Sequence, residues 1–183
     1  MALRTIFTTL LLIISSACAW GQTSAPLKSI ASLDVPRYLG RWYEIAKFPN
    51  WFQKKCVSDT SADYALQPDG TISVLNQCRR ADGEFDKALG QARQIGGANS
   101  AQLQVRFAPS WLTFLPFVWV DYWVVDLDDS YELVAVSEPK RDYLWILSRT
   151  PQVDSARYAA LIERMNAMGL ETGRLEMTRH PAQ

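Results

Sequence analysis

The spacing of hydrophobic and polar residues along this chain changes once, near Thr150-Pro151. From Leu33 up to that point, short runs of β-favouring residues are interrupted by turn residues about every 8 to 15 positions. The pattern predicts eight strands, at residues 41–48, 60–66, 71–78, 85–95, 102–107, 117–127, 131–137 and 143–149. Antiparallel strands joined by such short turns fit an up-and-down barrel, which has no exposed sheet edge, better than a Greek-key sandwich.

Beyond Pro151 the apolar residues recur at helical spacing. They are Tyr158, Leu161, Ile162, Met165 and Met168. The spacing predicts one amphipathic helix, capped at its start by Thr150 or Asp154 and ended by Gly169. A short final strand at 173–178 could pair back onto the sheet.

The first 21 residues read as a secretory signal peptide, with Arg4 before an apolar run and small residues after it. Two cleavage interpretations compete. Residues 15–18 resemble a bacterial lipobox, in which Cys18 is acylated and becomes the mature N-terminus. Ordinary cleavage at 17–19 or 19–21 would instead leave a soluble periplasmic or secreted protein. The remaining chain is expected to divide into a tether, one domain and a tail, at residues 22–32, 33–178 and 179–183.

Composition narrows the classes of function. The 183 residues are 48% hydrophobic, which is enough for one sizeable core. The 19 basic and 19 acidic residues balance, and no Lys/Arg run exceeds two, so no nucleic-acid partner is expected. The single histidine, His180, argues against a His-based metal cluster or a Ser/His/Asp triad. We expect no cofactor and no metal.

Cys56 and Cys78 are the cysteines left after export, in a compartment that permits a disulfide. A bridge is the favoured interpretation, but its geometry is constrained. If residues 67–70 form a four-residue hairpin loop, strict register sets Cys78 opposite Asp59, about 10 Å along the strand from Cys56. A bridge therefore requires the loop before that strand to curl back.

Eight strands, a helix and a strand, introduced by Gly40 and Trp42 as Gly-x-Trp, resemble the lipocalin family over about residues 33–178. A second family signature falls at 126–131, where the commoner Thr-Asp-Tyr is only partly kept. A third is Arg149 at the end of the eighth strand. Within the family, the chain looks most like the subgroup of bacterial outer-membrane lipocalins and apolipoprotein D.

The resemblance implies structural roles for Gly40, Trp42, Asp128 and Arg149. The signature tryptophan would close the base of the barrel, and the arginine would lie across it in a cation-π contact. By that carry-over we expect mutation of either residue to cost stability before it costs binding.

Strand alternation then selects candidate cavity residues. Glu44 and Ala46 share a face with the signature tryptophan, and Trp145 shares one with the signature arginine. Glu44 could equally be a buried carboxylate satisfied by a neighbouring Tyr or Arg. Tyr64 and Tyr122 could offer hydroxyls to a lipid head group or serve as ordinary packing.

Two aromatic stretches suggest contacts outside the cavity. Residues 48–52 are expected at the open mouth, as a hydrophobic lip for an entering acyl chain. The run 110–120 is either a half-buried loop plus strand or an exposed patch around Trp111 and Phe114 that touches the bilayer or a second subunit in a homodimer.

The resemblance implies a non-enzymatic carrier or storage protein of the bacterial cell envelope, anchored in the outer membrane through Cys18. Its expected ligands are fatty acids or lysophospholipids, used in membrane maintenance. Two alternatives stay open: a barrel enzyme with Cys56 or Cys78 as a cavity nucleophile, and a structural envelope lipoprotein with a filled barrel.

Overall fold

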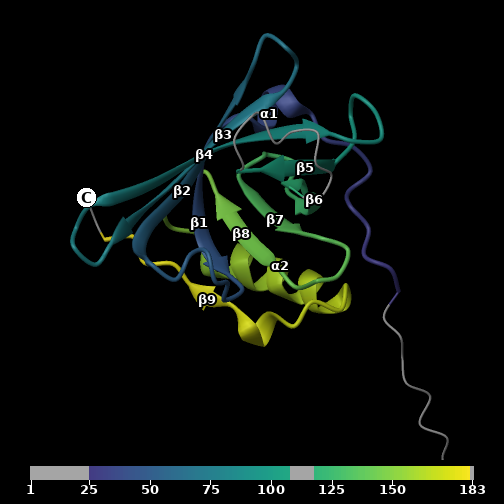
Figure 1. Cartoon of the computed structure of the whole chain (residues 1–183). Coiled ribbons are helices and arrows are strands. Elements are labelled where there is room, and N and C mark those ends of the chain that lie inside the picture. Colours follow the sequence, from purple (N-terminus) through teal and green to yellow (C-terminus); the bar gives the residue numbers. More distant parts are fainter. Residues whose placement is uncertain (1–24, 108–117, 182–183) are drawn as a thin grey trace, which may run out of the picture.

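The computed structural model describes residues 25–107 and 118–181 (Figure 1). The signal region with Cys18, and Trp111 with Phe114, lie outside the described residues. The elements in chain order are α1 (Val35–Tyr38), β1 (Gly40–Lys47), β2 (Cys56–Leu66), β3 (Ile72–Arg80), β4 (Phe85–Gln94), β5 (Gln102–Arg106), β6 (Val120–Leu127), β7 (Leu133–Ser137), β8 (Leu144–Ser148), α2 (Ser155–Ala167), η3 (Thr172–Arg174) and β9 (Glu176–Met177).

Strands β1 to β8 form a closed antiparallel barrel, as the sequence pattern predicts. Each strand pairs with the next along the chain, and β1 closes the circle by pairing with both β2 and β8. Because side chains alternate across each strand, one set points into the barrel and the other covers its outside.

The two sets form two cores. The inner core lies inside the barrel and includes Trp42, Tyr64, Val74, Val124 and Val136. The outer core lies between the wall and α2, which packs against the outside of the barrel (Figure 1). Its fully buried members include Phe48, Leu144, Ile146, Leu161 and Met165.

Local sequence explains where α2 begins and ends. The side chain of Asp154 accepts hydrogen bonds from the backbone N–H groups of Ala156 and Arg157, so Asp154 rather than Thr150 caps the helix. Gly169 follows the C-cap with φ +78°, a conformation that favours glycine. Arg164 pairs with Asp126 on β6 at 2.7 Å, which ties the helix to the barrel wall.

Two details depart from the predicted elements. A short helix, α1, precedes β1, where no element was expected. Strand β2 starts at Cys56 and is interrupted by register shifts between Cys56 and Ser58 and between Ser58 and Ser61. Asp59, in the second shift, has φ +53°. These irregularities bend β2 at the end away from α1.

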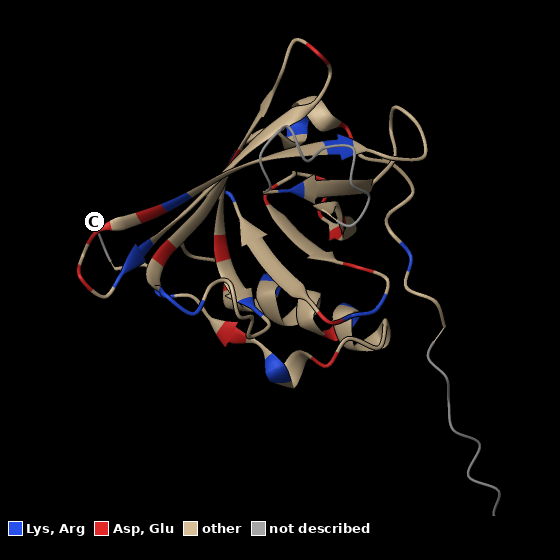
Figure 2. Ribbon diagram, in the orientation of Figure 1, with Lys and Arg blue, Asp and Glu red and all other residues tan. Residues whose placement is uncertain are grey.

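The C-terminal segment occupies the wall between β1 and β2 at the same end. β9 pairs with Ala46 and Lys47, beyond the part of β1 that pairs with β2. Past β9, Asp59 donates its backbone N–H to the carbonyl of Arg179 at 2.9 Å. Charges of both signs alternate along the strands and loops there, as Figure 2 shows.

Candidate ligand-binding barrel

One end of the barrel is closed by Trp42 and Arg149. The Arg149 guanidinium carbon lies 3.9 Å from the centroid of the Trp42 ring. Its nitrogens donate to the backbone carbonyls of Arg37 at 2.7 Å, Arg41 at 2.9 Å and Tyr131 at 3.2 Å. The structure thus places Arg149 across Trp42 as the family resemblance implies, with most of its donors used by main chain.

Gly40 lies beside this contact. Its φ is +92°, and a Cβ built there would lie 3.5 Å from an Arg149 guanidinium nitrogen, an ordinary contact distance. A larger residue would therefore strain the backbone rather than crowd the cation.

The helix α1 covers the same end. Asp34 caps it by accepting from the backbone N–H of Arg37, and Trp42 donates its ring N–H to the carbonyl of Tyr38 at 2.8 Å. The sequence prediction missed Tyr38 as a barrel residue. Asp34 and Pro36 are a recognisable helix start and could have indicated it.

Asp128 fixes the β6–β7 turn, the second family signature. One carboxylate oxygen accepts from the backbone N–H groups of Glu132 at 2.7 Å and Leu133 at 3.0 Å. Burial raises the pKa of this carboxyl, but the bonds from Leu133, Ser130, Glu132 and Arg157 together hold it below its ordinary value. Asp128 therefore has a structural role at the closed end, outside the barrel interior.

Inside the barrel, Tyr64 and Tyr122 meet. Their hydroxyl oxygens lie 2.9 Å apart, and the Tyr122 hydroxyl also lies 2.8 Å from that of Tyr38. Tyr64 is buried, whereas Tyr122, Val105 and Trp145 keep partly exposed surface although they pack against the inner core. These three side chains are therefore inner-core residues that are not fully buried.

Glu44 is a buried carboxylate nearer the other end, which is the mouth. It accepts hydrogen bonds from the Gln53 side-chain amide at 2.6 Å and from the Thr178 hydroxyl at 2.6 Å. Burial raises the pKa of Glu44, and the two hydrogen bonds, Lys47 and His180 oppose that rise only in part. Its partners are an amide and a hydroxyl instead of the expected Tyr or Arg.

Trp145 joins this network from β8. Its ring N–H donates to the Gln53 side-chain oxygen at 3.1 Å. The ring also stacks on Tyr143, with centroids 5.5 Å apart, and Phe52 packs against both rings. Trp145 therefore lies where the interior meets an aromatic cluster at the mouth.

Two expected orientations are wrong. Ala46 belongs to the outer core, because a register shift between Glu44 and Ala46 turns the strand by one residue. Phe48 is buried in the outer core beneath the guanidinium of Arg174, so it takes no part in a lip at the mouth. Of the residues 48–52, Trp51 and Phe52 are the exposed rings.

A disulfide joins Cys56 and Cys78, as predicted, with the Cα atoms 5.5 Å apart. The expected loop curl is replaced by the irregular pairing of β2 described above, which brings Cys56 within reach. Neither of these sulfurs is a free thiol.

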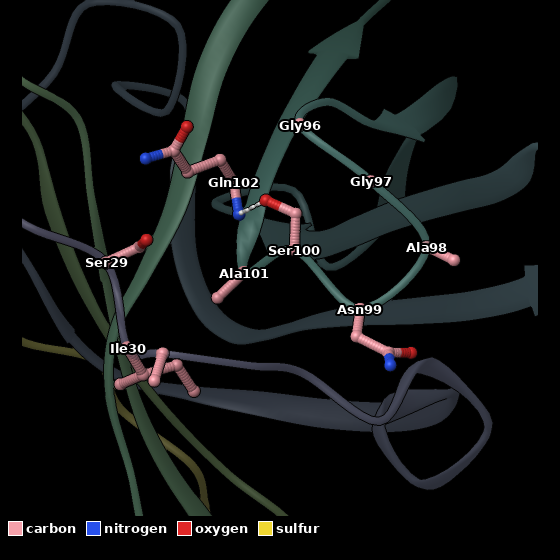
Figure 3. A pocket seen from close by; sticks show the side chains of 10 residues that line it. Ser29, Ile30, Gly96, Gly97, Ala98, Asn99, Ser100, Ala101 and Gln102 are labelled. Atoms are coloured by element: carbon pink, nitrogen blue, oxygen red, sulfur yellow. Dashed lines mark hydrogen bonds between the residues drawn. The ribbon is translucent and has the colours of Figure 1, made fainter.

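An open groove of about 440 Å³ lies outside this region (Figure 3). It runs between Ser29 and Ile30 of the N-terminal segment and the turn from Gly96 to Gln102. Its lining contains no ionisable side chain and mostly small ones, so it offers little to recognise a ligand by charge or by apolar depth.

A barrel plugged at one end, with half-buried side chains in its inner core and a helix on its outer wall, defines a class of binding protein. The family model described as "Lipocalin-like domain" matches residues 33–180, and the chain belongs to that family.

Among curated proteins, the chain is 41% identical to temperature-induced lipocalin-1 of Arabidopsis thaliana over 83% of this chain and 82% of that one. It is 34% identical to the outer membrane lipoprotein Blc of Vibrio cholerae over 94% and 96% of the two chains. It is 33% identical to apolipoprotein D of Macaca fascicularis over 85% and 80%.

Solved structures show the same fold at low identity. Insecticyanin from the tobacco hornworm Manduca sexta superposes with a TM-score of 0.66 and 16% identity over 85% of each chain. Lobster apocrustacyanin A1 gives a TM-score of 0.63 and 13% identity over 81% of each chain.

Proposed function

We propose that this protein carries or stores single-chain lipids, fatty acids or lysophospholipids, for membrane maintenance in a bacterial cell envelope. The observation that carries the proposal is the half-buried state of Tyr122, Val105 and Trp145 inside a barrel plugged by Trp42. Large side chains that line an interior and still have accessible surface leave room for a guest. Membership of the lipocalin-like family supports a small hydrophobic ligand.

Energetics favour an acyl chain as that guest. Each buried methylene contributes about 0.8 kcal/mol, so a sixteen-carbon chain gains on the order of 12 kcal/mol before costs. Ordering the chain and dehydrating its head group offset much of this gain. We therefore expect dissociation constants of about 1 μM or somewhat lower.

A thiol enzyme on the same barrel is disfavoured by the disulfide. Cys56 and Cys78 are joined to each other, so neither can act as a nucleophile. Counting free thiols in the unfolded, unreduced protein tests this point: two reactive thiols would revive the enzyme alternative.

Lipid binding is tested by native mass spectrometry of delipidated protein during titration with palmitic acid and with a sixteen-carbon lysophosphatidylcholine. We expect a one-to-one complex with at least one of them. If neither binds, the proposed function is wrong and a structural envelope protein with a filled barrel is the better interpretation.

We propose the outer membrane as the location, with acylated Cys18 as the anchor. The supporting observations are the lipobox-like residues 15–18 and the Blc relatives, which are named outer membrane lipoproteins. Helices in residues 25–107 and 118–181 are all too short or too polar to cross a membrane. Intact-mass analysis of protein extracted from its native envelope would show either an acylated Cys18 or the N-terminus left by ordinary signal cleavage, in which case the protein is periplasmic or secreted.

The run 110–120 is proposed as a surface that touches the bilayer or a second subunit. Val120, the last residue of the run, is 50% exposed, and Phe107, which precedes the run, is 46% exposed. Replacing Trp111 and Phe114 with Ser should reduce vesicle binding or dimer formation without lowering the melting temperature. Unchanged vesicle binding and unchanged mass in solution would contradict the proposal.

A further inference from the structure

Three tyrosine hydroxyls meet inside the barrel, although they come from distant parts of the chain. Tyr38 comes from α1, Tyr64 from β2 and Tyr122 from β6. Tyr122 lies at the centre, with its oxygen 2.8 Å from that of Tyr38 and 2.9 Å from that of Tyr64. We call these residues the tyrosine triad. Its rings belong to the inner core, among apolar side chains such as Val74, Val124 and Val136.

The triad has one more O–H donor than its own hydrogen bonds use. Each phenol carries one hydrogen, and the two contacts of the triad use two of the three. Whichever way the hydroxyls rotate, one O–H therefore has no acceptor within the triad. A buried donor without an acceptor costs about 1 to 3 kcal/mol, so an incoming acceptor is favoured there.

The triad can donate but does not ionise near neutral pH. Burial raises the pKa of Tyr64 to about 12 and raises those of Tyr38 and Tyr122 well above their ordinary value. The phenols are thus neutral donors. They suit a carboxyl, carbonyl or hydroxyl oxygen more than a cation.

The position of the triad sets the orientation of a ligand. Tyr38 packs on Trp42, with ring centroids 5.0 Å apart, so the triad lies at the closed end of the interior. Tyr122 alone of the three keeps partly exposed surface, which connects the triad to the accessible space. Toward the mouth, the buried carboxyl of Glu44 would repel an anionic head group held at its level.

We propose that the tyrosine triad is the anchor for the small polar head of a long-chain amphiphile, which enters head first and extends its chain toward Trp145 at the mouth. This inference rests on the proposed function and deepens it. The ligand class is a fatty acid bound as its neutral acid, or another single-chain lipid whose head is one carbonyl or hydroxyl group, because a buried carboxylate would cost more than one donor returns. A phosphocholine head is charged, strongly hydrated and much larger, so dehydrating it at the closed end would cost more than one donor returns.

The test uses the delipidated full chain, palmitic acid and a sixteen-carbon lysophosphatidylcholine as probes, and the variants Tyr122→Phe and Tyr158→Phe. Tyr158 lies on the outer side, where its hydroxyl contacts the Met177 sulfur, so its variant is a matched control for loss of one phenol oxygen. We expect Tyr122→Phe to weaken palmitic acid binding about tenfold, because Tyr122 is the triad member with accessible surface, whereas the Tyr38 and Tyr64 side chains are buried. Tyr158→Phe should bind as the wild type does.

A second measurement keeps the proposal testable if Tyr122→Phe folds poorly. Palmitic acid labelled with ¹³C at its carboxyl carbon is bound to the wild-type protein and followed by NMR from pH 5 to pH 9. A head-first carboxyl is shielded from solvent and should not titrate at the pKa of the free acid. An ordinary titration curve, or unchanged affinity in Tyr122→Phe, overturns the head-first site.

These outcomes separate the two proposals. Wild-type binding of either lipid with no effect of Tyr122→Phe leaves the carrier function standing and removes the triad as anchor. Absence of binding by both lipids removes both proposals together.

Discussion

The two ends of the barrel are held by different kinds of interaction, although β1 runs through both. At the closed end, Arg149 donates to three backbone carbonyls and Trp42 to a fourth. At the mouth, the Glu44 carboxylate is held by the side chains of Gln53 and Thr178, and backbone bonds tie the C-terminal segment to β1 and β2 beside it.

The difference indicates which contacts can rearrange. A backbone carbonyl in a strand or helix turn has a fixed direction, so a cation bonded to several of them acts as a permanent plug. Side-chain amides and hydroxyls can rotate to new partners at little cost. We infer that the side-chain contacts of Glu44 can rearrange when a ligand enters, while the disulfide and the backbone pairing of the C-terminal segment hold the wall around them.

The largest effect on stability is expected when Trp42, which closes one end of the barrel, is removed. Trp42→Ala removes a fully buried ring and the surface on which Arg149 rests, and should lower the free energy of unfolding by about 4 kcal/mol. Trp51→Ala is the matched control, because that ring is 74% exposed at the mouth and its loss should cost less than about 0.5 kcal/mol. Urea unfolding monitored by circular dichroism measures both. Equal losses would contradict the contrast between the two ends.

The second prediction tests the mouth. Replacing both Cys56 and Cys78 with Ser removes a covalent link between two residues that lie 22 positions apart in the sequence. The unfolded chain then regains loop entropy, so the free energy of unfolding should fall by about 3 kcal/mol. A reducing agent should destabilise the wild type similarly and leave the double variant unchanged. A wild type that is insensitive to reduction would show that the bridge contributes nothing.

Much of this contrast could be predicted from the sequence. Strand alternation and the three family signatures place Trp42, Arg149 and the barrel itself, because a period of two and a motif at a strand end are local properties. The helix α1 was not predicted, although Asp34 and Pro36 are a local signal for its start.

The mouth was less predictable for a physical reason. Glu44 finds its partners 9 and 134 residues away in the chain, at Gln53 and Thr178. No local pattern encodes such distant pairings. The bulge that turns Ala46 outward is likewise set by packing against the outer core, and one extra residue is enough to reverse a face.

The third prediction concerns the charge at the mouth. Burial raises the pKa of Glu44 above its ordinary value of 4.5, so the folded state holds that proton more tightly than the unfolded state does. The resulting stabilisation is full below about pH 4.5 and is lost as pH rises through the folded pKa. Glu44→Gln should remove this loss, so the variant should be more stable than the wild type at pH 7 by about 1 kcal/mol or less.

Unfolding curves from pH 4 to pH 8 measure the effect. Glu176→Gln is the control, because that carboxylate is 60% exposed in its pair with Lys47 and should change the pH dependence little. A wild-type stability that rises with pH across this interval, with no change in Glu44→Gln, would contradict the assignment.

The last prediction concerns the exposed ring of Trp51 at the mouth. Its loss should change stability least of all the variants, but it tests ligand entry most directly. Trp51 packs edge-on against Phe52, which contacts the Tyr143 and Trp145 rings, so the exposed ring continues an apolar path into the barrel. Removing it in Trp51→Ala should leave the melting temperature within about 1 °C of the wild type. The rate at which delipidated protein takes up palmitic acid should nevertheless fall, because the first apolar contact at the mouth is lost. Stopped-flow quenching of tryptophan fluorescence follows this rate. The control is Leu66→Ala, because Leu66 is an exposed residue at the end of β2, on the closed side of the barrel. If both variants take up lipid at the wild-type rate, the mouth rings are not part of the entry route. If only Trp51→Ala is slow, the lipid enters at the mouth.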